Sequence, residues 1–241
     1  MELVIDCGNT FIKTGLFHQN KFIESGIFPN DEFSSIEQLV LTASLDAIIL
    51  SSVIELPTEF MAKIQAAAPV FLELLQDTPI PFENMYRTPA TLGKDRIAGV
   101  AGAMALSSGE NVMVVDAGTC ITIDVLANGK MYIGGSISPG LNMRLQAMHH
   151  FTHRLPQVEL REFADLNGLT TEECMLAGAL SGAVSEVDGF IDKWQNKLAG
   201  LKVYLTGGDG TILLSHLKSN IFAEPNLILT GLHKILLYNA H

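Results

Sequence analysis

Apolar runs of strand length alternate with helical stripes along the chain. In the first half, strand-like runs cover Leu3–Ile5, Phe11–Phe17, Lys21–Phe28 and Ala47–Leu50. Apolar residues at helical spacing predict helices over Asp31–Leu41 and Glu55–Ala67. Strands that alternate with helices are typical of an α/β fold in which mixed sheets are flanked by helices.

The opening pattern returns in the second half. Strand-like runs cover Val112–Val115, Ile121–Leu126, Lys130–Ser138 and Lys202–Leu205. Asp6 ends the first strand of one half and Asp116 ends that of the other, and each is followed two residues later by a glycine. A repeat of this length predicts two duplicated domains, residues 1–107 and 108–241, with a cleft between them. The alternative is a pair of unrelated β-turns.

The turn after Asp6 suits a phosphate bound with a metal ion. Gly8, Asn9 and Thr10 could present backbone N–H groups and a hydroxyl to phosphate oxygens. Asp6 could bind Mg²⁺ directly or through water, and Lys13 could add positive charge. A single turn of this type is weak evidence, because Asp-x-Gly also occurs in plain β-turns.

A second group of charged residues opens a predicted helix. The proline-rich connection 76–92, which contains Tyr86, leads into Gly93-Lys94-Asp95-Arg96 and then into a helical stripe. Asp95 could cap this helix. Alternatively, its carboxylate could face a substrate, with Arg96 beside it to bind an anionic group.

Two glycine-rich turns follow later strands. Residues 134–140 read GGSISPG before a predicted helix, whose first amides could face a phosphate. Gly207 and Gly208 follow the strand at Lys202–Leu205 and could let a nucleoside ring pack on the backbone. A glycine-rich entry to a helix is the other interpretation of that second turn.

The long helix predicted from about residue 172 to 198 carries an apolar stripe. This stripe is interpreted as core or as a partner interface, and Gly178 and Gly182, four residues apart, would allow another helix to approach closely. Two further helices are expected at Thr211–Lys218 and Leu227–Tyr238. The combination of large apolar residues and close-approach glycines predicts a homodimer.

Composition excludes several classes of protein. The 241 residues carry 15 Lys+Arg against 26 Asp+Glu, and this net charge of −11 argues against a broad nucleic-acid surface. The longest apolar runs are too short for a membrane span, and Met1 leads straight into a strand without a signal peptide. Cys7, Cys120 and Cys174 lack metal-ligand spacing and suit a reducing cytoplasm. His149 and His153 lie one helical turn apart, but no carboxylate completes a familiar metal site.

Taken together, these stretches resemble type III pantothenate kinases, within the actin, sugar-kinase and acetate-kinase superfamily. The matching segments are DCGNTFIK at 6–13, Tyr86, GKDR at 93–96, DAGT at 116–119, GGSISPG at 134–140 and residues 171–178. They occur in the same order as in the family over nearly the whole chain. Signatures of other phosphate-binding classes, G-x-x-x-x-G-K-[ST] and G-x-G-x-x-G, are absent from the sequence.

The resemblance implies two ribonuclease-H-like domains and ATP-dependent phosphorylation of pantothenate in a homodimer. Implied ATP contacts are Asp6, Cys7, Gly8, Asn9, Thr10, Phe11, Ile12, Lys13 and Thr119, with Mg²⁺ at Asp6. Implied pantothenate contacts are Tyr86, Gly93, Lys94, Asp95, Arg96 and Thr171. Asp95 would accept the proton, and Asp116 would hold K⁺ or NH₄⁺.

The chain departs from the family's pattern at two positions. Gly99 and Thr170 stand where Asn is common in the family, which makes local substrate contacts less certain. Two other functions stay open: a nucleotide-phosphate hydrolase of the same superfamily, and a regulatory relative that binds ligand without turnover. The combination of Lys13, Asp95, Arg96 and Asp116 favours the enzyme.

Overall fold

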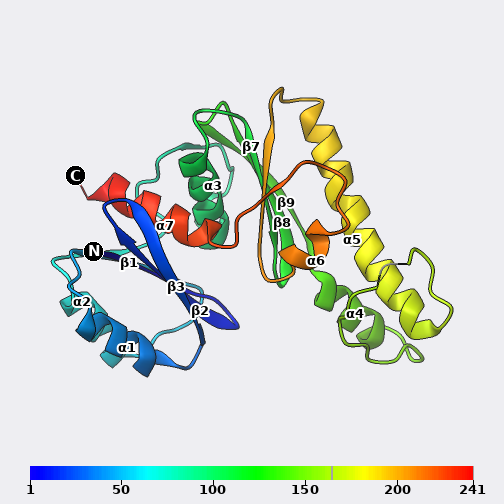
Figure 1. The fold of residues 1–241 in the computed structure, drawn as a ribbon, viewed down its shortest axis with the longest axis horizontal. Coiled ribbons are helices and arrows are strands. Elements are labelled where there is room, and N and C mark those ends of the chain that lie inside the picture. Colours follow the sequence, from blue (N-terminus) through cyan, green and yellow to red (C-terminus); the bar gives the residue numbers. More distant parts are fainter. Residues whose placement is uncertain (164, 241) are drawn as a thin grey trace. The chain divides into compact units, whose positions relative to one another are not determined.

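The computed structural model describes residues 1–163 and 165–240 of the chain. These residues form two compact units (Figure 1). Unit 1 comprises Met1–Ser108, Lys130–Tyr132 and Asn226–His241, and unit 2 comprises Gly109–Gly129 and Ile133–Pro225. Both units contain a mixed sheet flanked by helices, so the predicted α/β class is confirmed.

The main sheet of unit 1 has the strand order β3-β2-β1-β4-β5. Its strands are β1 (Glu2–Cys7), β2 (Phe11–His18), β3 (Lys21–Pro29), β4 (Ala47–Ser52) and β5 (Val70–Glu73). β1 pairs antiparallel with β2 and parallel with β4, so it lies in the middle of the sheet. Because side chains alternate along a strand, Leu3, Ile5 and Cys7 share one face of β1, whereas Glu2 and Asp6 share the other.

Helices cover both faces of this sheet. α1 (Phe33–Thr42) and α2 (Thr58–Ala66) lie together over one face (Figure 1), where Ile36 and Ile64 pack against Leu3 and Ile5 in a fully buried cluster. α3 (Lys94–Leu106) and α7 (Leu227–Asn239) pack against the sheet elsewhere in the unit, with α7 contacting β1, β2 and β4. On the other face of β1, Glu2 and Asp6 flank the buried Val4.

The C-terminal helix α7 belongs to unit 1, whereas the sequence division at residue 107 placed it with the second domain. α7 packs closely on α3 through two glycines. A Cβ built on Gly231 would lie 1.7 Å from the Ala98 carbonyl oxygen, and one built on Gly102 would lie 2.2 Å from that of Leu227. No side chain fits at these two positions, so the glycines allow the two helices to approach each other closely.

Unit 2 is built on β7 (Val112–Ala117), β8 (Cys120–Ala127), most of β9 (Met131–Pro139), β10 (Lys202–Thr206) and β11 (Phe222–Ala223). Its helices are α4 (Leu141–His150), α5 (Thr171–Gln195) and the short α6 (Gly210–Leu214). Met113, Val115 and Ala117 pack on the apolar stripe of α5, including Ala183 and Val187. The stripe predicted as core or interface is therefore core of this unit.

The two opening hairpins repeat the same arrangement around an aspartate. Asp6 lies opposite Lys13 on the antiparallel neighbour and beside Ser51 on the parallel neighbour. Asp116 lies opposite Thr122 and beside Thr206 in the same way. This correspondence of strand direction and register supports the predicted duplication. The predicted cleft between the domains stays a prediction.

Three strands were missed by the sequence prediction, and one of them is the two-residue β11. β5 follows α2, and β6 (Glu83–Asn84) lies inside the connection predicted to be irregular, which also contains the 3₁₀ turn η1 (Pro89–Thr91). β6 pairs in parallel with Met131 and Tyr132 of β9, all within unit 1. Its pairing partner lies almost fifty residues away in the sequence, so a local pattern does not reveal it.

α5 alone among the described helices is long and apolar enough to cross a membrane, by length and composition. Half of its most apolar window is buried inside the protein. The core helix of a globular unit has the same properties, and the packing of α5 on β7 accounts for its apolar residues.

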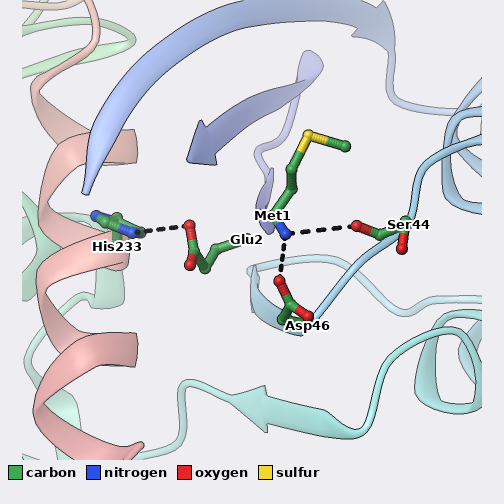
Figure 2. A network of polar contacts seen from close by, with 5 residues as sticks. All are labelled: Met1, Glu2, Ser44, Asp46 and His233. Carbon is green, nitrogen blue, oxygen red and sulfur yellow. Dashed lines mark hydrogen bonds and ion pairs between the residues drawn. The ribbon is translucent and has the colours of Figure 1, made fainter. Parts of the chain in front are cut away.

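The start of β1 is held by polar contacts (Figure 2). The amino group of Met1 forms an ion pair with Asp46 and donates to the Ser44 carbonyl oxygen at 3.4 Å. Glu2 faces His233 of α7, with 3.8 Å between Oε2 and Nε2. β1 is thus fixed at the end opposite Asp6.

Candidate active site

Asp6 lies near the carboxyl end of β1, between charged and polar partners on the neighbouring strands. Its carboxylate accepts a hydrogen bond from Ser51 and is attracted by the positive charge of Lys13, and both interactions lower the pKa of Asp6. Burial nevertheless raises the pKa of Asp6 to about 6, and the negative charge of Asp95 adds to this rise. Asp6 and Asp95, from different elements of unit 1, therefore act electrostatically on one another.

The turn that follows β1 is open to solvent. The Gly8 amide donates to the Phe11 carbonyl oxygen at 3.0 Å, and Asn9 and Thr10 are exposed at the tip. Phe11 is 49% exposed, so its ring could contact a ligand. By contrast, the side chains of Cys7 and Ile12, which were predicted to contact ATP, lie in the core, where only their backbone could take part.

Burial also determines the chemistry of Cys7. It raises the pKa of the Cys7 thiol to about 12, and the neighbouring Asp6 charge adds to the effect. A thiol with this pKa stays protonated at neutral pH and is a poor nucleophile. Cys7 is accordingly a structural residue of the unit 1 core.

Asp95 lies in the first turn of α3 but does not cap it. The N-cap residue is Gly93, and the cap makes no side-chain hydrogen bond. The Asp95 side chain instead folds back over Gly93, since a Cβ built there would lie 2.3 Å from Asp95 Oδ1. The capping interpretation of Asp95 is therefore wrong, and its exposed carboxylate is available to a ligand.

Arg96 is buried beside Tyr86, a contact that the sequence pattern did not predict. Only 6% of Arg96 is exposed, and its guanidinium carbon lies 5.5 Å from the centroid of the Tyr86 ring. Such cation–π contacts stabilise a desolvated guanidinium. Lys94, on the other side of Asp95, donates from Nζ to the Ser52 carbonyl oxygen at 3.2 Å, which ties the start of α3 to β4.

Unit 2 brings the second aspartate turn against the Gly-Gly turn. Gly207 has a φ of +95°, and a Cβ there would lie 2.3 Å from the Ala117 carbonyl oxygen and 2.5 Å from Asp116 Oδ1. Only glycine fits such a position. Thr119 and Gly208 are both exposed beside this junction in the chain.

The GGSISPG stretch also closes on the second aspartate turn. The amide of Gly140 donates to the Thr119 carbonyl oxygen at 3.1 Å, and a Cβ on Gly140 would lie 2.3 Å from the Gly118 carbonyl oxygen. Arg144 donates from Nε to the Pro139 carbonyl oxygen at 2.8 Å and forms an ion pair with Glu186 of α5. Three segments distant in sequence thus meet around Asp116.

Thr171 is the first residue of α5 and is exposed. Thr170 precedes it as the N-cap and forms a capping box with Glu173, in which each side chain bonds the other's backbone amide. Thr170 therefore has a structural role that Asn could also fill. Thr171 lines a surface hollow of about 510 Å³ together with Met148, Leu155 and Met175.

Two residues of the unit 1 site were missed by the sequence prediction. Ser51 bonds Asp6, and Tyr132 stacks on Tyr86, with ring centroids 6.2 Å apart and an interplanar angle of 29°. Ser51 could have been found as the first polar residue after the buried AIIL strand. No sequence pattern identifies Tyr132 as a site residue. It pairs with β6, and the two residues of β6 do not show the alternation of apolar and polar residues that predicts a strand.

The donor set of unit 1 fits Mg²⁺ bound together with phosphates. Among residues 1–163 and 165–240, no group of three or more His, Cys, Asp and Glu could hold a metal ion by itself. Mg²⁺ in phosphoryl-transfer sites usually takes one or two carboxylates and completes its octahedron with substrate phosphates and water. Asp6, at the carboxyl end of β1 and next to the exposed phosphate-type turn, supplies one such carboxylate.

Comparisons with known proteins show what this chain is similar to. Residues 2–193 match the profile of the family "Type III pantothenate kinase". Type III pantothenate kinases from Christiangramia forsetii and Phocaeicola vulgatus are 42% and 38% identical to this chain, and each alignment covers 99% of both proteins.

Solved structures with the same fold include enzymes and a regulator. A Baf family transcriptional activator from Campylobacter jejuni is 27% identical, with a TM-score of 0.60 and coverage of 99% of this chain and 98% of that one. The ROK hexokinase of Thermus thermophilus has a TM-score of 0.53 at 14% identity, covers 99% of both chains, and supports the fold alone. The family profile and the full-length relatives show that this chain belongs to the type III pantothenate kinase family.

Proposed function

We propose that this chain transfers the γ-phosphoryl group of ATP to the primary hydroxyl of pantothenate, which gives 4'-phosphopantothenate and ADP in the first step of coenzyme A synthesis. The observation that carries the proposal is that unit 1 joins the phosphate-type turn at Asp6 to Asp95 and Arg96. Family membership supplies the identity of the acceptor.

The nucleotide would be held by the turn residues Asp6, Gly8, Asn9, Thr10 and Lys13, and by Thr119, Gly207 and Gly208 of unit 2. Lys13 would neutralise phosphate charge, and the exposed tip of the turn would present backbone amides to the phosphates. Mg²⁺ bound at Asp6 would supply further neutralisation of the charge on the phosphates. The backbone of Cys7 and Ile12, rather than their buried side chains, would contribute.

Pantothenate would be bound by Tyr86, Gly93, Lys94, Arg96 and Thr171. The Arg96 guanidinium would pair with its carboxylate. Asp95 would accept the hydroxyl proton while the new bond between that oxygen and the γ-phosphorus forms and the bond from phosphorus to the ADP oxygen breaks. Positioning and charge stabilisation carry most of the catalysis in such transfers.

Asp116 would hold a monovalent cation, K⁺ or NH₄⁺. Asp116 Oδ1 and the Ala117 carbonyl oxygen both lie close to Gly207, so two hard oxygen donors are present there. A carboxylate near three phosphates would be repelled unless a cation lay between them. This cation would complement the Mg²⁺ at Asp6.

The chain would act as a cytoplasmic homodimer. The large apolar residues of α5 are used inside unit 2, but Gly178, Gly182 and Ser185 remain exposed on the same helix. A Cβ on Gly178 would meet nothing within 4 Å, which leaves room for close approach by a partner helix. Analytical ultracentrifugation tests this, and a 26.1 kDa species at micromolar concentration would exclude the dimer.

A regulatory function is the second candidate, favoured by the similarity to the Campylobacter jejuni Baf family protein. A coupled assay of ADP formation, with and without pantothenate, separates the possibilities. The kinase requires ADP release that depends on pantothenate. ADP release without pantothenate would indicate a nucleotide hydrolase, and no release at all would indicate a regulator.

A further inference from the structure

Three aromatic rings and Arg96 form a cluster in unit 1, in which Tyr86 is half-buried and the other residues are buried. Tyr132 is 1% exposed, and its ring centroid lies 6.1 Å from that of Phe82 and 6.2 Å from that of Tyr86. Tyr86 in turn carries the Arg96 guanidinium 5.5 Å from its centroid. Tyr132 therefore contacts the residue that supports Arg96 but is not itself among the residues expected to touch pantothenate.

The backbone around Tyr132 also fixes the Tyr86 segment. The Met85 amide donates to the Tyr132 carbonyl oxygen at 3.0 Å, and the Glu83 amide donates to that of Lys130 at 2.9 Å. The Tyr86 amide then donates to the side chain of Asn84 at 2.9 Å. These bonds form the short parallel pair between β6 and β9, which orders a connection that is otherwise largely irregular.

Loss of the Tyr132 ring would affect one substrate more than the other. The ring contacts Tyr86 and Phe82, and both belong to the segment that leads to Arg96. Asp6 and its turn are held separately, by the pairing of β1 with β2 and β4. A hole beside Tyr86 should therefore loosen Arg96 while the phosphate turn keeps its geometry.

We infer that Tyr132 is a positioning residue for the acceptor, which acts through Tyr86 to hold the Arg96 guanidinium where it pairs with the substrate carboxylate. This inference rests on the proposed function. The contribution comes from the ring, because the contacts that reach Tyr86 and Phe82 are ring contacts. Phenylalanine at position 132 should therefore still hold Arg96 in place, whereas leucine should not.

The test compares Tyr132→Leu, Tyr132→Phe and a matched control, Phe60→Leu, in the full chain. Phe60 is also 1% exposed and contacts another ring, Phe33, but lies on α2 within the α1–α2 core cluster, which does not include Tyr132. KM values for pantothenate and for ATP are measured separately, together with kcat. Calorimetry gives the pantothenate Kd without turnover, and circular dichroism confirms that each variant is folded at the assay temperature.

Tyr132→Leu should raise the pantothenate KM and Kd by about 5–30-fold, the range expected for loss of aromatic and cation–π support. Its ATP KM and kcat should stay within about twofold of wild type. Tyr132→Phe and Phe60→Leu should leave the pantothenate KM unchanged. The inference fails if Tyr132→Leu leaves that KM unchanged, if both KM values rise together, or if Phe60→Leu has the same effect. Wild-type protein without pantothenate-dependent ADP release would overturn the proposed function, and the inference with it.

Discussion

The negative charge of Asp95, in the first turn of α3, adds to the rise that burial causes in the pKa of Asp6 on β1. The two residues are 89 positions apart in the sequence, yet the fold of unit 1 brings their carboxylates within electrostatic reach. Burial is the largest cause of the rise, and the Ser51 hydrogen bond and the Lys13 charge act in the opposite direction. Under the proposed function the two carboxylates would have separate roles: Asp6 towards metal and phosphates, and Asp95 towards the acceptor.

Replacement of Asp95 by Asn should lower kcat by about 10²–10⁴-fold, the usual contribution of a positioned base. ATP affinity should change little, since Asp95 is not the residue paired with Lys13. Gly93 is the N-cap of α3, so loss of capping would not explain the fall. Steady-state kinetics with each substrate varied test this, and Asp6→Asn serves as the contrast because it should weaken Mg²⁺-dependent nucleotide binding instead. A folded Asp95→Asn protein with near-normal kcat would remove the base assignment.

Mg²⁺-dependent nucleotide binding should weaken as the pH falls through about 6. The pKa of Asp6 is raised to about 6, so below this pH the carboxyl is protonated and no longer suits a metal. Lys13→Met should move the midpoint to higher pH, because the positive charge that lowers the pKa of Asp6 is lost. Asp95→Asn should move it to lower pH.

Isothermal titration calorimetry between pH 5 and 8 measures these midpoints. Lys21→Met is the matched control, because Lys21 is an exposed lysine at the start of β3 and should leave the midpoint where it is. If Asp6 is the group that titrates, the pH midpoint must shift in opposite directions in the Lys13 and Asp95 variants. Shifts in the same direction would mean that Asp6 is not the group that titrates.

Gly93→Ala should displace the Asp95 carboxylate with little loss of stability. A Cβ at Gly93 would lie 2.3 Å from Asp95 Oδ1, the far end of a side chain that can rotate away. The backbone at Gly93, with φ −59° and ψ 137°, accepts alanine. We expect kcat to fall at least about tenfold, because a misplacement of about 1 Å can cost 10²-fold.

A double variant tests whether this effect passes through Asp95. Adding Gly93→Ala to Asp95→Asn should lower kcat no further, because the two changes remove one interaction. Gly189→Ala is the control, since a Cβ there meets nothing within 4 Å on α5. A full additional loss in the double variant would show that Gly93 acts by another route.

Much of unit 1 follows from local sequence pattern. The apolar run before Asp6 and the helical stripe after Arg96 specify β1 and α3, and the repeated Asp-x-Gly spacing identifies both aspartate turns. Periodicity of this kind reports which face of an element is buried. It does not report which elements share a core.

The residues that were missed depend on contacts that are distant in the sequence. β6 is a strand only because it pairs with Met131 and Tyr132, and α7 joins unit 1 because Gly231 allows contact with α3. The contact between Tyr132 and Tyr86 follows from the first of these pairings. Neither contact can be recognised from the pattern of apolar and polar residues in β6 or α7. The sequence therefore predicted that α7 is a helix but not that it packs in unit 1.

Because of His233, the free energy of unfolding should fall as the pH drops below about 6.5. Its ring is buried, stacks on Phe17 with centroids 3.9 Å apart, and faces Glu2 (Figure 2). Burial lowers the pKa of His233 despite the Glu2 charge. The unfolded chain therefore binds a proton before the folded chain does, and stability is lost at up to about 1.4 kcal/mol per pH unit.

Urea unfolding at pH 5.5 and 7.5 measures this loss. His233→Phe keeps the stacking partner of Phe17 but removes the titrating group, so its stability should decline less on acidification than that of wild type. His153→Phe, at an exposed histidine of unit 2, should keep the wild-type pH dependence. Equal pH dependence in the wild type and His233→Phe would exclude His233 as the cause.

Activity should require K⁺ or NH₄⁺ as well as Mg²⁺, because the Asp116 carboxylate and the phosphates would otherwise repel each other. Asp116 lies beside Thr206 in the register of β7 and β10, and its Oδ1 lies against Gly207. Turnover should therefore fall at least about tenfold when Na⁺ is the sole monovalent cation. Asp116→Asn should abolish the stimulation by K⁺ and lower activity even when K⁺ is saturating.

The cation effect must be separated from a general effect of salt on the enzyme. K⁺ and Na⁺ are compared at constant ionic strength, with choline chloride as the balance, so that screening of exposed charges is equal in every assay. Asp188→Asn, at a partly buried aspartate of α5 outside the proposed site, should keep the full stimulation by K⁺. Full turnover of the wild type in Na⁺ alone would rule out the cation site. Stimulation that persists in Asp116→Asn would place the cation at other residues.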